Sequence, residues 1–110
     1  MSRVRLSILA AIAVLSASAA LFAQQARIAG TRPDCVTVAA QPIFNGSGYN
    51  HLVTITNGCA SAVSCTVTTD VNPRPISVAV EPRQSRTVNT YFNAAAYGFT
   101  PTVHCASAAR

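Results

Sequence analysis

From residue 35 onward the chain repeatedly alternates apolar and polar side chains, with a period of two. Valine or isoleucine alternates with threonine, serine or alanine in CVTVA, HLVTITN and PISVAV, and cysteine or proline joins the apolar set in VSCTVTTD and TPTVHC. Such alternation is typical of a β-strand with one face buried and the other in water. The composition agrees, because the chain after residue 23 holds one leucine, ten valines and eleven threonines, and β-branched residues favour sheets over helices.

The turns between these segments are rich in glycine, asparagine and proline, and they separate strands of similar length. We expect strands at 35–40, 51–58, 63–70, 76–80, 85–92 and 100–106, with a short additional strand at 42–45 as an alternative. The Ala94–Ala96 triplet is long enough for a single helical turn only. The sequence therefore predicts an all-β fold, a small antiparallel, immunoglobulin-like β-sandwich of six or seven strands, with a closed barrel as the second choice.

The first 23 residues have the layout of a secretory signal peptide. Arg3 and Arg5 precede an uncharged run that ends near Ala23, where we expect cleavage, with Ala20 as the other site. An uncleaved anchor helix is the competing interpretation, although alanine and serine insert weakly into a bilayer. We therefore expect a secreted or periplasmic protein with no membrane span after cleavage. Its parts would be a signal peptide (1–23), a flexible segment (24–33) and one disulfide-stapled domain (34–110).

Few charges remain after the leader, and none forms a recognisable catalytic group. Six arginines face three acidic residues, Asp34, Asp70 and Glu81, which leaves a formal charge of +3. The arginines are scattered, so binding would release few counterions from nucleic acid, and we expect no nucleic-acid partner. Each carboxylate lies in or beside a predicted turn, and no nucleophile or phosphate-loop motif is present. We expect no enzyme activity, no catalytic residue and no cofactor.

Four cysteines, Cys35, Cys59, Cys65 and Cys105, lie in the predicted domain. An even number in an exported chain predicts two disulfides. Loop-closure entropy does not select a pairing: it gives about 2.4 and 4.4 kcal/mol for 59–65 with 35–105, and about 3.5 and 3.9 kcal/mol for 35–59 with 65–105. Position favours 59–65 across a predicted reversal, with 35–105 joining the terminal strands. The other two pairings remain open.

A metal or redox role for these cysteines is disfavoured by their spacing. Cys59 and Cys65 are farther apart than structural zinc ligands usually are, and His51 and His104 do not form a paired motif. His104 adjoins Cys105, but neighbours on a strand point to opposite faces. A catalytic dithiol would need C-x-x-C at the start of a helix. We expect no metal site, and a small metal-binding protein is the alternative.

Three tyrosines, Tyr49, Tyr91 and Tyr97, form the candidate binding surface. They lie in or beside two loops, FNGSGYN and NTYFNAAAYGFT, which are rich in the residues used by loop-based recognition surfaces. If the two loops met at one end of the sandwich, they would form an aromatic patch. The competing interpretation is that Phe92 and Phe99 fill the core and the tyrosines cover its rim.

The segments ITNGC, VSCTV, NPRPISVAVEP and FTPTVHC together resemble small secreted bacterial β-proteins with two disulfides and no assigned activity. The resemblance covers residues 35–106 and implies a sandwich fold in an envelope or extracellular setting, with no catalytic residue. We expect a binding or structural module whose partner is an unknown protein or a cell-envelope component. An inhibitor of a secreted enzyme, acting through loop 92–100 or 70–75, is the alternative.

Overall fold

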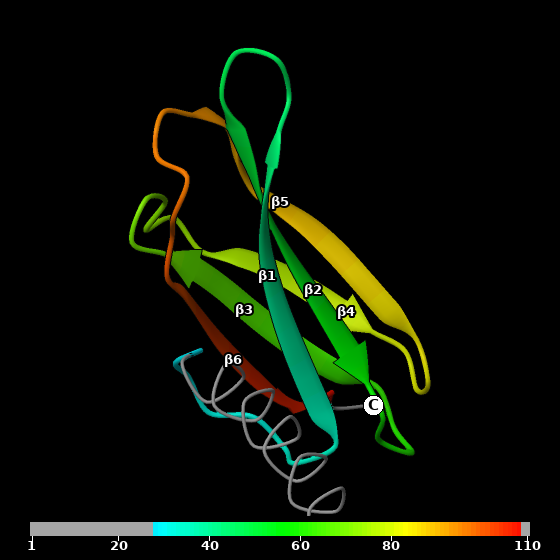
Figure 1. The fold of residues 1–110 in the computed structure, drawn as a ribbon. Coiled ribbons are helices and arrows are strands. Elements are labelled where there is room, and N and C mark those ends of the chain that lie inside the picture. The colour runs from blue at the N-terminus through cyan, green and yellow to red at the C-terminus, as the bar shows by residue number, and fades with distance from the viewer. Residues whose placement is uncertain (1–27, 109–110) are drawn as a thin grey trace, which may run out of the picture.

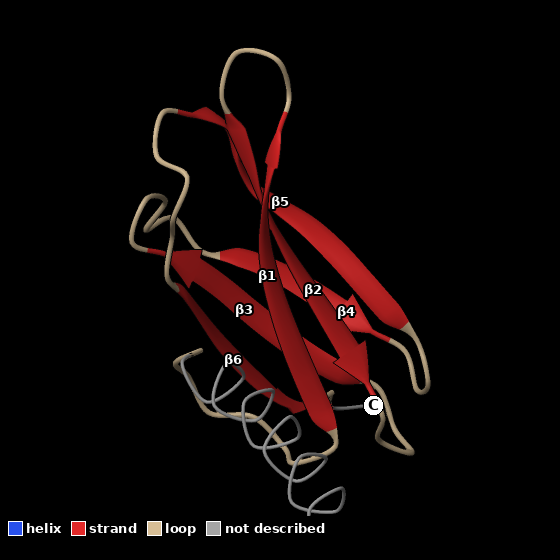
Figure 2. Cartoon of the chain, in the orientation of Figure 1, coloured by secondary structure: helices blue, strands red, loops and turns tan. Residues whose placement is uncertain are grey.

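The computed structural model describes residues 28–108 and places six antiparallel strands in two sheets (Figure 1). The strands are β1 (Val36–Phe44), β2 (Tyr49–Asn57), β3 (Val63–Thr69), β4 (Ile76–Val80), β5 (Ser85–Ala94) and β6 (Pro101–Ser107). Between residues 28 and 108 the chain forms no helix (Figure 2), and so it offers no long apolar helix that could cross a membrane. The predicted signal peptide, and residues 24–27 after it, lie outside the described residues.

The strands form a β-sandwich of two three-stranded sheets. One sheet has the order β1-β2-β5 and the other β4-β3-β6. Their facing sides bury a core made mostly of valine, to which each sheet contributes alternate residues: Val36, Val38, Val53, Ile55, Val63, Val67, Val78, Val80 and Val103. The predicted all-β sandwich is confirmed. The alternation of apolar and polar residues in the sequence corresponds to the alternation of buried and exposed side chains along the strands. The immunoglobulin-like arrangement stays a prediction.

All six expected strands occur, and the short additional strand at 42–45 is wrong. β1 runs without interruption through Pro42 to Phe44. The amide of Gly58 donates to the carbonyl of Cys35, so in this antiparallel pair the odd-numbered residues of β1 bond to β2. The nitrogen of Pro42 therefore faces the open edge of the sheet, where a missing N–H costs no ladder bond. The Ala94–Ala96 triplet ends β5 without a helical turn.

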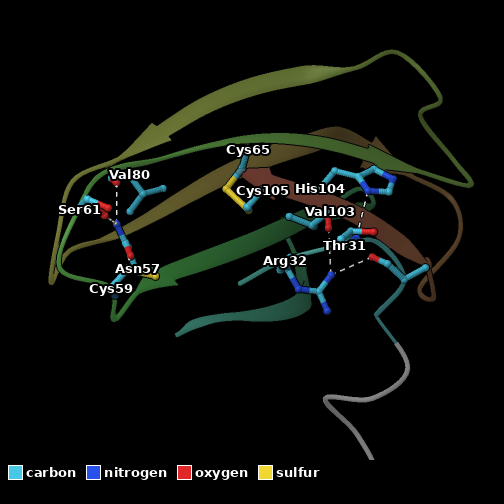
Figure 3. The surroundings of a disulfide bond; sticks show 11 residues. Thr31, Arg32, Asn57, Cys59, Ser61, Cys65, Val80, Val103, His104 and Cys105 are labelled. Carbon is cyan, nitrogen blue, oxygen red and sulfur yellow. Dashed lines mark hydrogen bonds between the residues drawn. A yellow bond between two sulfur atoms is a disulfide. The ribbon is translucent and has the colours of Figure 1, made fainter. Parts of the chain in front are cut away.

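The chain crosses from one sheet to the other directly after β2, so the reversal predicted between Cys59 and Cys65 is not a hairpin within one sheet. The fully buried side chain of Asn57 holds this crossover in place. Its Nδ2 donates to the carbonyls of Ser61 (3.0 Å) and Val80 (2.9 Å), and its Oδ1 accepts from the amide of Cys59 (2.9 Å), as Figure 3 shows in part. One asparagine thus links the end of β2, the crossover and the end of β4.

The disulfides join Cys35 to Cys59 and Cys65 to Cys105, so the pairing favoured by position is wrong. Cys65 and Cys105 are direct partners in the β3–β6 ladder, with Cα atoms 4.1 Å apart (Figure 3). Cys35 and Cys59 close the open end of the β1–β2 hairpin, with Cα atoms 5.1 Å apart. The favoured pairing fails because Cys59 lies beside β2 while Cys65 lies in the opposite sheet.

Residues 28–32, which we call the N-terminal strap, run parallel to β6 along its free edge. The amides of Val103 and Cys105 donate to the carbonyls of Ala29 and Thr31, each at 2.9 Å. The Arg32 guanidinium adds hydrogen bonds to the carbonyls of Ala29 and Val103 (Figure 3). The sequence predicts a flexible segment at 24–33, whereas Ala29 and Thr31 within it pair with β6.

Two further features complete the contact between the strap and β6. The Thr31 amide donates to Nδ1 of His104 at 3.1 Å, so a side chain takes the place of a ladder carbonyl. Gly30 has φ of 114°, and a Cβ atom there would overlap the Val103 carbonyl. Only glycine fits this close approach without strain.

Candidate binding surface

The β1–β2 hairpin extends beyond the end of the opposite sheet (Figure 1). Val36 and Val38 are buried on its inner face. Side chains two apart on a strand share a face, so Ala40, Pro42 and Phe44 continue the same face toward the tip. There they change from buried to half-buried or exposed. At the tip of the hairpin, therefore, the face that is buried in the core elsewhere is not covered by the opposite sheet.

Three aromatic rings occupy this uncovered face. Phe44 and Tyr49 are cross-strand partners in the hairpin, with ring centroids 5.4 Å apart. Tyr97, from the connection between β5 and β6, meets Tyr49 edge to face at 5.3 Å. Phe44 remains 63% exposed and Tyr97 65% exposed. We call Phe44, Tyr49 and Tyr97 the aromatic overhang.

A network of polar side chains joins the hairpin tip to the end of β5. Asn45 Nδ2 donates to Asn50 Oδ1 at 2.9 Å, and the same oxygen accepts from the amide of Asn93 at 3.1 Å. The Ser47 hydroxyl donates to Asn93 Oδ1 at 2.6 Å. These bonds tie two segments that are distant in the sequence into one end of the molecule.

The backbones of these two segments also approach each other closely. A Cβ atom on Gly48 would come within 2.9 Å of the carbonyl oxygen of Ala94, so a side chain there would push the segments apart. Asn93 has φ of 62°, in the left-handed region that asparagine tolerates better than most residues. The approach of the hairpin tip to β5 therefore depends on a glycine on one side and an asparagine on the other.

His51 anchors the segment that carries Tyr97. Its ring is fully buried and stacks on Phe99, with centroids 4.2 Å apart. Its Nε2–H donates to the carbonyl of Ala96 at 2.8 Å; because a carbonyl only accepts, Nε2 must carry a proton in this contact. The other nitrogen, Nδ1, has no hydrogen-bond partner among the described residues. Tyr97 is thus flanked by two residues fixed to the core.

The structure brings two of the three predicted tyrosines together. Tyr49 and Tyr97 are in contact, whereas the ring partner of Tyr91 is His51, at 6.3 Å. Tyr91 is 42% exposed and makes no ring contact with the other two tyrosines. The two loops do meet at one end of the sandwich, as the patch required.

The two phenylalanines that the competing interpretation placed in the core differ from each other. Phe92 is 71% exposed, so its placement in the core is wrong, whereas Phe99 is partly buried and packs against the core. Phe44 was not among the predicted site residues. The signal that could have found it is its place directly before the NGSG turn, which puts it across the hairpin from Tyr49.

Groups able to carry out chemistry are sparse in the described part of the chain. Among residues 28–108, no group of three or more His, Cys, Asp and Glu side chains is placed to hold a metal ion, and all four cysteines are in disulfides. Asp70 accepts a hydrogen bond from the amide of Thr100 at 2.7 Å. A cleft of about 260 Å³ between the strap and β1 is lined by Gly30, Arg32, Pro33, Asp34, Val36, Thr37 and Val38. Asp34 is the one carboxylate in this lining.

No protein-family model, no curated protein and no solved structure matches this chain. Fold and surface therefore define its class: a small β-sandwich, stapled by two disulfides, with an aromatic overhang at one end. Two disulfides suggest folding in an oxidising compartment, either periplasmic or extracellular.

Proposed function

We propose that this protein is an exported, non-enzymatic module that binds an envelope or extracellular partner through its aromatic overhang. The observation that carries the proposal is the uncovered inner face of the hairpin, on which Phe44 and Tyr97 are 63% and 65% exposed. Contiguous apolar patches on soluble proteins mark interaction sites. Aromatic side chains are also enriched among the residues that dominate binding energy.

The rigidity of this end supports a binding role. The asparagine network, the stacked His51 and the close approach at Gly48 hold the overhang in one arrangement before any partner arrives. A surface ordered in advance loses less conformational entropy on binding. The signal-peptide layout of the leader, the two disulfides and the resemblance to small secreted bacterial β-proteins support export to the envelope or beyond.

Co-sedimentation with envelope fractions of the producing cells tests the proposal. We expect the mature protein to be retained by one fraction, and Phe44→Ser and Tyr97→Ser each to reduce that retention. Ile43→Ser is the matched control, since Ile43 is the neighbour of Phe44 on the opposite face of β1 and is itself 38% exposed. Equal retention of all three variants would show that the overhang does not bind.

The loop at 70–75 supports a second candidate function, inhibition of a secreted enzyme. Asn72 braces this loop: its amide donates to the Thr69 hydroxyl (2.8 Å), its Nδ2 donates to the Thr90 carbonyl (2.7 Å), and its Oδ1 accepts from the Arg74 amide (3.1 Å). Exposed Arg74 lies between two prolines. A braced loop that presents one cation suits an enzyme with an acidic pocket.

Titration of trypsin tests this second candidate. An inhibitor would abolish activity at one equivalent, and Arg74→Ala would remove the inhibition while Arg86→Ala, an exposed arginine on β5, would not. Undiminished trypsin activity at excess protein would exclude inhibition of this protease by Arg74.

A further inference from the structure

We propose that the ligand of the aromatic overhang is an uncharged polysaccharide, an inference that rests on the proposed function. Both segments that build this end lack formal charge: residues 35–69 and 87–108 contain no Asp, Glu, Lys or Arg. Charged partners are recognised by complementary charges, and the overhang has none to offer. The ligand should therefore be neutral.

The rings themselves combine the two kinds of contact that a sugar makes. An aromatic face carries partial negative charge, and the C–H groups of a sugar ring carry partial positive charge, so the two stack favourably. Tyr97 is 65% exposed, and the hydroxyls of Tyr49 and Tyr97 can each donate to or accept from a sugar hydroxyl. Phe44 adds a ring without a polar group at the other end of the row.

The tilt of the rings favours a chain over a single flat molecule. Phe44 and Tyr49 are inclined at 55°, and Tyr49 and Tyr97 at 89°, so the three rings do not form one plane. A ligand that contacts all of them must change direction between rings. A polysaccharide does so at each glycosidic bond, and successive sugar units can meet successive aromatic side chains.

Insertion into a lipid bilayer is the less favourable use of this end. The apex of the hairpin, beyond the rings, consists of Asn45, Gly46, Ser47 and Gly48. These residues would enter a membrane ahead of Phe44 and Tyr49, and burying their amide and hydroxyl groups in hydrocarbon is costly. Neither segment contains a Lys or Arg that could attract anionic headgroups.

Retention of the purified mature protein on insoluble chitin and on insoluble cellulose tests the ligand class. We expect retention on at least one of them, unchanged in 1 M NaCl, because no ion pair contributes. Phe44→Ala and Tyr97→Ala should each weaken retention about five- to tenfold, as expected for the loss of one stacking ring. Ile43→Ala should bind like the wild type, and circular dichroism should verify that every variant is folded.

Three results would overturn the inference. The first is no retention on either polysaccharide; the second is equal retention of Phe44→Ala and Ile43→Ala. The third is binding of the protein to phosphatidylcholine vesicles, or dimerisation in solution, that Phe44→Ala abolishes, because the overhang would then belong to a lipid surface or to a second copy. If envelope retention still depended on Phe44 in the first case, the proposed function would stand and the polysaccharide would be wrong.

Discussion

The rings of His51 and Phe99 lie nearly parallel, 4.2 Å apart with an interplanar angle of 10°. His51 belongs to β2 and Phe99 to the connection between β5 and β6, so this stacking joins the two segments that build the aromatic overhang. The hydrogen bond from His51 to the Ala96 carbonyl, on the other side of Tyr97, reinforces the same junction. The position of an exposed tyrosine thus depends on a histidine that is completely buried.

Replacing His51 should separate these two contributions. His51→Phe keeps a ring against Phe99 but leaves the Ala96 carbonyl without its donor, and we expect a loss of about 1–2 kcal/mol in unfolding free energy. His51→Ala also removes the stacked ring and leaves a cavity, and we expect a loss of about 3 kcal/mol or more. Urea unfolding measures both losses. Equal stability of His51→Phe and the wild type would show that the bond to Ala96 contributes nothing.

The two disulfides should differ in what their removal costs. Cys65 and Cys105 are 1% and 8% exposed in the core, whereas Cys35 is exposed at the rim. Removing the Cys65–Cys105 disulfide costs about 3.9 kcal/mol of loop-closure stabilisation, and removing Cys35–Cys59 costs about 3.5 kcal/mol. The Cys65→Ala/Cys105→Ala variant additionally loses core packing. We expect it to unfold at lower urea concentration than Cys35→Ala/Cys59→Ala.

The connectivity itself can be mapped by non-reducing elastase digestion. Cleavage among the alanines between Cys59 and Cys65 should release one linked pair containing Cys35 with Cys59 and another containing Cys65 with Cys105. A fragment linking Cys35 to Cys105 would contradict the structure.

Gly30 and Gly46 form a matched pair for testing the strap. Both have positive φ, 114° and 103°, but a Cβ atom would overlap Val103 at Gly30 and meet nothing within 4 Å at Gly46. We expect Gly46→Ala to cost about 1 kcal/mol from backbone strain alone. Gly30→Ala should displace the strap and speed hydrogen exchange at the amides of Val103 and Cys105, which donate to it. Unchanged exchange in Gly30→Ala would mean that the strap does not protect β6.

Asn57→Asp should be among the most destabilising single substitutions. The change replaces both Nδ2 donors with a carboxylate oxygen facing the carbonyls of Ser61 and Val80, inside a fully buried site. We expect a loss of about 3 kcal/mol or more. Asn72→Asp is the control, since this half-buried residue loses a single side-chain donor bond, to Thr90. Thermal unfolding compares the two; similar melting temperatures would contradict the role of Asn57 at the crossover.

Much of the fold is local information, and the rest depends on partners distant in the sequence. The alternation around Val53 and Ile55 predicted both the strand and its buried face, because a strand needs only its own residues to present one side. The predicted pairing of Cys59 with Cys65 is wrong because the chain leaves one sheet for the other between these two residues. No local pattern in the sequence marks that point. The aromatic overhang can be predicted only in part from the sequence. The composition of their loops marks Tyr49 and Tyr97 as candidate binding residues, but nothing in the sequence shows that their rings are in contact or that Phe44 joins them.

By itself, the sequence determined the class of structure, an all-β fold, through β-branched residues with a period of two and turn residues between them. Only the tertiary structure decided which strands share a sheet, which cysteines pair and which apolar residues remain in water. The physical reason is length: β1 and β2 extend past the sheet that would cover them. Whether a side chain is core or surface then depends on where the opposite sheet ends, and no residue encodes that by its own pattern.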